Sequence, residues 1–219
     1  MLWGSALAAG AEAHRRHADR GEAIGAALET TRRLVASFTE RTGSASCRDV
    51  TGADFKARLG TLRYVLGGGA WRCFQLAAAW APEAIRIAAE GPSQAPAAPP
   101  PPAASCASEV ALRKGATAQH VVMVAGLAGG LGLGGQACGA LGAAVWLDSL
   151  AWGEAHPDRM KDLYDNPRAA RTVAAFEAVT DGEFQCPRIA GRRFATVEEH
   201  TAFVRSGGCG TLIEALGRT

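Results

Sequence analysis

The chain has 219 residues, with 23 Lys and Arg against 21 Asp and Glu and a formal net charge of +2. This balance gives no indication of a nucleic-acid partner, and we expect none. A chain of this length buries roughly 70% of its unfolded surface, so its core does not depend on disulfides. The six cysteines therefore need another explanation.

The first half of the chain, residues 1–90, is predicted to be helical. Apolar side chains recur at helical spacing between Ala6 and Thr39, and a further helix is expected from Cys73 to Ala89. Pro82 either breaks that last helix or lies in the first turn of a new one. The apolar start has its arginines after it and no basic residue before it, which is the wrong order for a signal peptide. We expect a cytoplasmic protein, whose cysteines are more often ligands or reactive thiols than disulfides.

Residues 91–105 separate the two halves of the chain. They contain a run of four prolines, which cannot form a helix and cannot donate to a sheet. We expect a semi-rigid polyproline linker. It would join the first helical half, residues 1–90, to the second, residues 106–219.

The second half is also predicted to be helical. Helices are expected at 106–113, 140–152, 168–179 and 212–216, and a capping box at Thr196 should start another helix that runs through Val204. Residues 121–147 carry no formal charge and are long enough to cross a bilayer. Their many glycines make a poor continuous helix, so a buried hairpin with a Gly-rich bend is preferred to a membrane span.

The two halves share a pattern of cysteine, glycine and phenylalanine. Cys47 is followed by Gly52 and Phe55, and Cys186 by Gly191 and Phe194, with the same Cys-x4-Gly-x2-Phe spacing. A Gly-rich turn and another cysteine follow each time, Cys73 in the first half and Cys209 in the second. The pattern predicts an all-α fold built from two homologous halves, which points to sulfur chemistry as well as packing.

The second half holds four cysteines that are far apart in sequence: Cys106, Cys138, Cys186 and Cys209. Without a CxxC pair their spacing does not identify a zinc or iron–sulfur site. Cys138 lies among small residues that allow close approach of backbone or cofactor, and we expect Gly134, Gly135 and Gly139 to shape a pocket there. At a helix start its thiol pKa would also be lowered.

These cysteines, with Cys138-Gly139-Ala140, resemble the C-GCAxxG-C-C family of redox-active proteins, which is related to the split-Soret cytochromes. The chain departs from the family pattern where Ala137 replaces a glycine and where the closing glycine is shifted to Gly142. The resemblance implies that the four cysteines are redox-active or bind a cluster. We therefore expect an iron–sulfur cluster as the preferred cofactor, thiol–disulfide exchange as the close alternative, and a redox partner protein of unknown identity.

Cys47 and Cys73 form an incomplete second set. They would pair with each other, complete a site in a homodimer, or remain inert. In the register of the repeat, Met1 falls two residues after the position of the motif cysteine of the first half. Either this half has lost two of its cysteines or the start codon is assigned too late.

Other interpretations remain open. A GxGxxG pattern begins at Gly130 after the strand-like residues 120–124, with Asp148 at 18 residues from it, and resembles a weak dinucleotide fingerprint. The histidines, His14, His17, His120, His156 and His200, are expected on solvated faces or in the core. The alternative to a redox protein is a structural or small-molecule-binding helical module with inert core cysteines.

Overall fold

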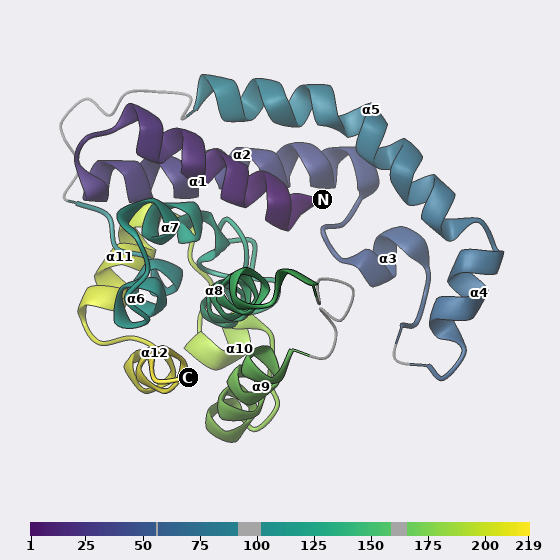
Figure 1. The fold of residues 1–219 in the computed structure, drawn as a ribbon. Helices are drawn as coiled ribbons and strands as arrows, with labels where there is room; N and C mark the ends of the chain where they lie inside the picture. The colour runs from purple at the N-terminus through teal and green to yellow at the C-terminus, as the bar shows by residue number, and fades with distance from the viewer. Residues whose placement is uncertain (56, 92–101, 159–165) are drawn as a thin grey trace.

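The computed structural model describes residues 1–55, 57–91, 102–158 and 166–219 (Figure 1). Within these residues it is helical and contains no β-strand, which confirms the predicted all-α class. In chain order the elements are α1 (Leu2–Arg16), α2 (Arg20–Thr42), α3 (Cys47–Thr51), α4 (Gly60–Leu66), α5 (Gly69–Glu90), α6 (Cys106–Arg113), α7 (Ala118–Met123), the 3₁₀ helix η1 (Ala125–Leu127), α8 (Gly139–Ala155), α9 (Pro167–Thr180), α10 (Cys186–Ala190), α11 (Val197–Arg205) and α12 (Gly210–Gly217).

The helical segment expected from Ala6 to Thr39 is two helices, α1 and α2. The break lies at residues 17–19, where the side chain of Asp19 accepts a hydrogen bond of 2.9 Å from the backbone of Glu22 and so starts α2. The two helices lie side by side (Figure 1) and contact each other through alanines that are almost fully buried, which allows close approach of their backbones.

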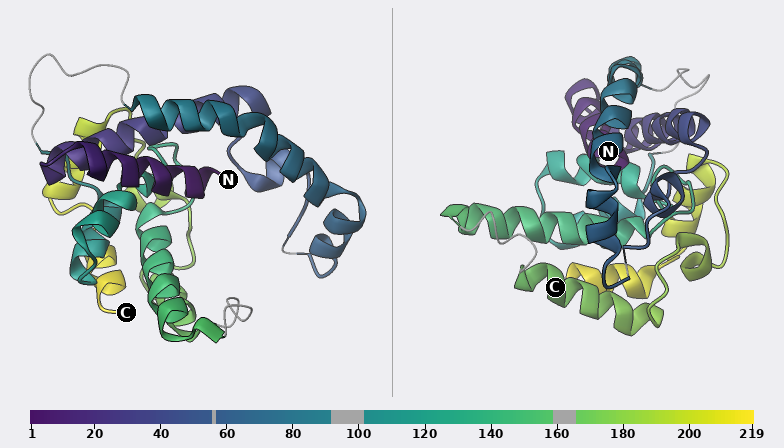
Figure 2. Two further views of the ribbon diagram at one scale, coloured as in Figure 1. Left: turned by 45° about the horizontal axis from the view of Figure 1, so that its top comes forward. Right: turned by 90° about the vertical axis from the view of Figure 1, so that its right-hand side faces the viewer.

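Helix α5 is continuous through Pro82, so neither interpretation of that proline as a break or a helix start was right. The C-terminal portion of α5 packs on α2, where the ring of Trp80 meets Phe38 edge-on at 5.0 Å and its indole N–H donates to Ser37. The N-terminal portion of α5, with α3 and α4, projects away from the other helices (Figures 1 and 2).

In the second half of the chain α6, α8, α9 and α12 pack on one another, and α11 contacts α2. Asn166 caps α9 through its side chain, which accepts hydrogen bonds from the first turn, and Thr196 caps α11 through Glu199 as the capping box predicted. Phe176 and Leu216 are fully buried where α9 and α12 meet.

The Gly-rich stretch between α7 and α8 is buried against α2. A Cβ at Gly126 would lie 2.1 Å from the hydroxyl of Thr31, and one at Gly132 would lie 2.9 Å from the backbone of α2. Only glycine therefore permits this contact. Among the described residues no helix is long and apolar enough to cross a membrane.

The helices of the two halves follow one another in the same order. A single shift of 139 residues, the separation of Cys47 from Cys186, matches α3 with α10 and the ends of α1 and α4 with those of α8 and α11. Glycines in the left-handed conformation recur at the same shift, Gly43 with Gly182 and Gly52 with Gly191. Residues of both halves contribute to one hydrophobic core. Common origin remains a prediction, and most of the predicted linker, residues 92–101, lies outside the described residues.

A buried ion pair connects three helices of the second half. Lys114 Nζ lies 2.9 Å from an Asp148 carboxylate oxygen, and both side chains are less than a tenth exposed. Thr172 Oγ1 donates to the other oxygen of Asp148, and Lys114 also donates to the hydroxyl of Thr219 at 3.0 Å. The ammonium and the carboxylate thus satisfy each other away from water.

Replacement of Lys114 by Met is expected to lower the free energy of unfolding by about 3–5 kcal/mol, because it leaves the Asp148 carboxylate buried without its counterion. Urea denaturation at neutral pH measures this loss. The matched control is Glu83→Gln, which removes the exposed ion pair with Arg86 and should hardly change the urea midpoint. Equal small effects of the two substitutions would contradict the prediction.

Candidate functional site

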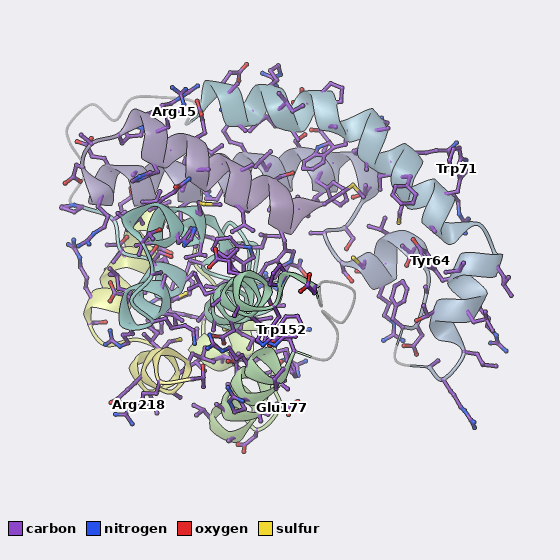
Figure 3. The ribbon with its side chains drawn as sticks, in the orientation of Figure 1. Arg15, Tyr64, Trp71, Trp152, Glu177 and Arg218 are labelled. Carbon is purple, nitrogen blue, oxygen red and sulfur yellow. The ribbon has the colours of Figure 1, made fainter. Side chains whose placement is uncertain are left out.

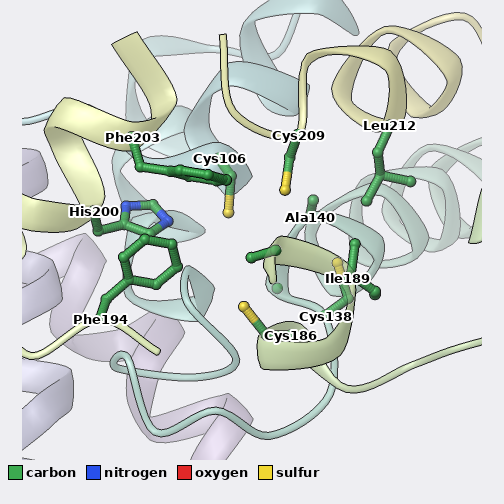
Figure 4. Close-up of a pocket in the computed structure, with 12 residues that line it drawn as sticks. Cys106, Cys138, Ala140, Cys186, Ile189, Phe194, His200, Phe203, Cys209 and Leu212 are labelled. Atoms are coloured by element: carbon green, nitrogen blue, oxygen red, sulfur yellow. The ribbon is translucent and has the colours of Figure 1, made fainter. Parts of the chain in front are cut away.

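The four cysteines of the second half line one cavity (Figure 4). Cys106, Cys138, Cys186 and Cys209 reach it from four different elements, although 103 residues separate the first from the last. The cavity has a volume of about 10 Å³, which is the space of a single water-sized group. The predicted convergence of these side chains is therefore present in the structure, and their role as metal ligands stays a prediction.

Each of the four cysteines stands at the start of a helix. Cys106 and Cys186 are the first residues of α6 and α10, while Cys138 and Cys209 are the N-caps of α8 and α12. The first backbone N–H groups of a helix lack intrahelical partners and carry a partial positive charge. These helix starts favour negative charge on the sulfur atoms, but the burial of the thiols acts in the opposite direction and outweighs them.

Backbone hydrogen bonds hold Cys138 and Cys186 next to each other. The N–H of Cys138 donates to the carbonyl of Phe184 at 2.8 Å, and the N–H of Cys186 donates to the carbonyl of Gln136 at 3.0 Å. These bonds flank an antiparallel bridge between Ala137 and Gln185. The start of α8 and the start of α10 are thereby fixed side by side, which the sequence separation of these cysteines did not reveal.

Cys209 is held in a left-handed backbone conformation, with φ of 56°. Residues other than glycine rarely adopt it, and such strain concentrates at functional sites. The preceding Gly208 is also constrained, since a Cβ there would lie 2.4 Å from the ring of Phe203, another side chain that lines the cavity. The Gly-Gly-Cys-Gly sequence thus fits a turn that directs the Cys209 sulfur inward (Figure 4).

An open groove of about 430 Å³ adjoins the cavity. Cys209, Ile189 and Leu212 line both of them, and polar side chains such as Glu183 and Arg188 line the groove alone. Cys209 is partly exposed, whereas the other three cysteines of the cavity are buried. Cys209 is therefore the cysteine through which the cavity meets solvent.

Burial raises the pKa of all four thiols. It raises the pKa of Cys186 to about 12 and that of Cys209 to about 11, with smaller contributions from the neighbouring cysteines. It raises the pKa of Cys106 well above its usual value. It raises the pKa of Cys138 as well, in opposition to hydrogen bonds from backbone groups at the start of α8. Without a metal the four groups are thus neutral thiols near pH 7.

His200 also lines the cavity, and sequence reasoning missed its place there. Its side chain is only 2% exposed, its Nδ1 has no hydrogen-bond partner among the described residues, and its ring meets that of Phe194 edge-on at 5.0 Å (Figure 4). Burial lowers the pKa of His200 to about 4, against a smaller opposing effect of the backbone of Ala104. The capping box at Thr196 was the available signal, because it places His200 on the buried face of α11.

The glycines predicted to shape the pocket divide into two groups. Gly139 lines the cavity, and a Cβ there would lie 1.8 Å from the carbonyl oxygen of Leu127. Gly134 and Gly135 lie outside the lining, and a Cβ on Gly135 would meet the side chain of Arg193. Only Gly139 therefore acts directly on the shape of the site.

Cys47 and Cys73 lie outside this cavity. Both are free thiols; Cys47 is exposed, and Cys73 is partly buried and accepts a hydrogen bond of 2.8 Å from the hydroxyl of Tyr64 (labelled in Figure 3). By the 139-residue shift Cys47 matches Cys186, but Cys73 matches Leu212. The second cysteine of each half therefore follows its Gly-rich turn at a different distance.

The strand and the dinucleotide fingerprint considered from the sequence are both absent from the structure described here. Residues 118–123 form helix α7 and no strand, so the pattern at Gly130–Gly135 lacks the context of a dinucleotide site. Asp148 is engaged in the buried ion pair with Lys114. Of the other histidines, His156 stacks on Trp152 and His120 meets Trp146 edge-on, as structural contacts.

Across the residues that the structure describes, no three His, Cys, Asp or Glu side chains are already arranged as a set that would hold a metal ion. Comparisons with protein-family models, with curated proteins and with solved structures found no match for this chain. The resemblance to the C-GCAxxG-C-C family therefore rests on the residues of the chain alone.

His200 is expected to make the protein sensitive to acid. An unfolded histidine takes up a proton near pH 6.5, whereas folded His200 does so only near pH 4. Its stabilising effect is therefore present above pH 6.5 and is lost as the pH falls toward 4. The loss relative to His200→Gln should be about 3 kcal/mol. Urea denaturation from pH 7 to pH 4 measures it, and identical pH profiles of the two proteins would contradict it.

The four thiols are expected to react in an order set by burial. In a Cys47→Ser/Cys73→Ser background, Cys209 should be alkylated by iodoacetamide first and Cys106 last. Because a pKa near 11 leaves little thiolate at pH 7, Cys209 should react at least about 100-fold more slowly than an unperturbed thiol, with a tenfold gain per pH unit. Peptide mapping by mass spectrometry follows the order. Alkylation of Cys106 before Cys209 would contradict the prediction that burial limits access of the reagent to the thiols.

Proposed function

We propose that residues 106–219 form a redox module in which Cys106, Cys138, Cys186 and Cys209 bind iron through their thiolates. The iron would be held as an iron–sulfur cluster or as a single ion, and would exchange one electron at a time with a partner. The observation that carries the proposal is the convergence of four cysteines, each from the start of a different helix, on one cavity.

The donor set supports this proposal. Four sulfur atoms and one histidine are the potential ligands in the lining, which contains no carboxylate among the described residues and is otherwise apolar. Soft thiolate ligands select iron–sulfur clusters, iron or zinc, whereas carboxylate-rich sites select harder ions. An apolar shell around the sulfur atoms also limits access of water, which tunes the reduction potential.

The size of the cavity bears on the form of the metal. A volume of about 10 Å³ accommodates one ion. A cluster of several iron and sulfide atoms would require the cavity walls to move apart. The walls belong to different helices, and α10 and the start of α12 follow loops, so this movement need not break the helices themselves. Both forms are retained in the proposal, and chemical analysis distinguishes them.

The raised thiol pKa values argue against the alternative of metal-free thiol–disulfide exchange. Exchange requires a thiolate as nucleophile, and thiols with a pKa of 11 or above provide very little of it near pH 7. A bound metal removes this limit, because coordination deprotonates the thiol. Metal binding should therefore release protons and strengthen with pH.

A structural or small-molecule-binding module with inert cysteines is the remaining alternative, since buried thiols with raised pKa values are also expected there. The partly exposed position of Cys209 at the groove favours the redox proposal. In this proposal the groove next to Cys209 is where a redox partner approaches, because among the four cysteines Cys209 alone connects the cavity to solvent.

Anaerobic incubation of the apoprotein with ferrous iron and sulfide should give a coloured protein with visible thiolate-to-iron or sulfide-to-iron absorption. Replacement of Cys138 or Cys186 by Ser should reduce bound iron by at least about tenfold, because a ligand is lost. Acid-labile sulfide in equal amount to iron indicates a cluster, and its absence indicates a single ion.

The matched controls are Cys47→Ser and Cys73→Ser, which lie outside the cavity and should retain full iron binding. A colourless protein that binds no iron but whose cavity thiols form disulfides reversibly would support exchange. A colourless protein without either property would support the inert module and overturn the proposal.

A further inference from the structure

The projecting segment of the first half exposes an unusual number of large apolar side chains. We call residues 47–74, which include α3, α4 and the start of α5, the arm (Figures 1 and 2). Between residues 55 and 74 seven large apolar side chains are 44–78% exposed; these are Phe55, Leu59, Leu62, Val65, Leu66, Trp71 and Phe74. Single exposed apolar residues are common, but a concentration of this kind indicates an interaction surface.

The corresponding elements of the second half show what such a surface is built to contact. At the 139-residue shift, Phe55 matches Phe194 and Phe74 matches Ile213, which are 6% and 3% exposed. Helix α12, which carries Ile213, packs on α6 and α9. No element among the described residues covers the arm in the same way, since α6 is already packed on α8 and α12. One face of the arm is thus shaped to receive helices.

The arm is apolar even where the second half is not. Leu59 matches Glu198, and Leu66 matches Arg205; both of these charged residues are exposed. Exposure of these leucines to water does not stabilise the fold. They extend the apolar surface of the arm to positions that are charged in the second half. We therefore interpret the arm as a surface that is covered by a partner.

The exposed apolar area of the arm fits a second copy of the chain. Large side chains of roughly 150–250 Å² each, about half exposed, leave on the order of 800 Å² of apolar surface, which is the share of one partner in a standard interface. Arg63 and Arg72 lie on α4 and α5, and Asp49 and Asp54 lie on or next to α3. Because Asp54 is already paired with Arg48 of α3 at 3.7 Å, we place these charges at the rim, and the apolar side chains carry the association.

We propose that two copies of this chain associate through their arms about a two-fold axis. The same residues contribute from both copies, as in most homodimers. The apolar side chains of α4 and the start of α5 form the centre of the interface, and the arginines and aspartates lie at its rim. The four-cysteine cavity of each copy lies outside this interface, so dimerisation and iron binding are separate properties.

Sedimentation equilibrium of the full chain tests the proposal. The unmodified protein should form a dimer, and Leu66→Glu or Phe74→Glu should raise its dissociation constant at least about 30-fold, because each places a charge in a desolvated centre. The control is Ile85→Glu, on the same helix beyond the arm and 69% exposed, which should leave the dissociation constant unchanged. Circular dichroism confirms that each variant is folded.

The salt dependence of binding distinguishes a second copy of the chain from a charged membrane surface. An apolar self-interface should lose less than about tenfold in affinity between about 50 and 500 mM salt, because its charges lie at the rim. A monomer at every concentration and salt would overturn the proposal, as would a dimer that the arm variants leave unchanged. A monomer that binds anionic phosphatidylserine vesicles at low salt only would assign the arm to a membrane surface instead, and would also overturn it.

Discussion

The position of the cysteines depends on how closely the Gly-rich stretch before α8 can approach its neighbours. At Gly126 and Gly132 this stretch touches α2, and at Gly139 it leaves no room for a Cβ beside the carbonyl of Leu127. These contacts fix the start of α8 and with it Cys138. The bridge from Ala137 to Gln185 then fixes the start of α10. The cavity is therefore a consequence of backbone packing more than of side-chain attraction.

Burial has opposite consequences for the cysteines with and without a metal. In the absence of a metal it keeps the thiols protonated, which suits an apolar cavity, since isolated thiolates there would be costly. With a metal the sulfur atoms lose their protons and the negative charge is shared with the cation and with the helix starts around it. In the proposed function the same pocket would resist unspecific thiol chemistry and would hold the metal. His200, neutral at physiological pH for the same reason, adds no charge to the cavity.

Much of the fold was accessible from the sequence because its signals are local. Helical periodicity and the capping box at Thr196 identified most of the longer helices, and the resemblance to the C-GCAxxG-C-C family indicated which four thiols belong together. The break between α1 and α2 lies in the polar residues 14–22, and it was missed because Asp19 was not recognised as the capping residue of a new helix. The place of His200 and the separation of Gly134 and Gly135 from the cavity depend on tertiary packing. No spacing in the sequence encodes such contacts.

The two halves carry similar side chains at matching positions but differ in how deeply these side chains are buried. At the common shift, Cys47 stands for Cys186, Phe55 for Phe194 and Tyr64 for Phe203. These are the same kinds of side chain in the same order. In the second half these side chains face a cavity that α6 and the start of α8 help to close, and its Cys186 thiol is buried.

In the first half the equivalent wall is open, so Cys47 and Phe55 are exposed. This wall is apolar although it faces water. Exposed aromatic surface favours unwanted association unless a specific partner occupies it. The open wall is therefore more readily understood as an interface than as a remnant of a second cysteine site.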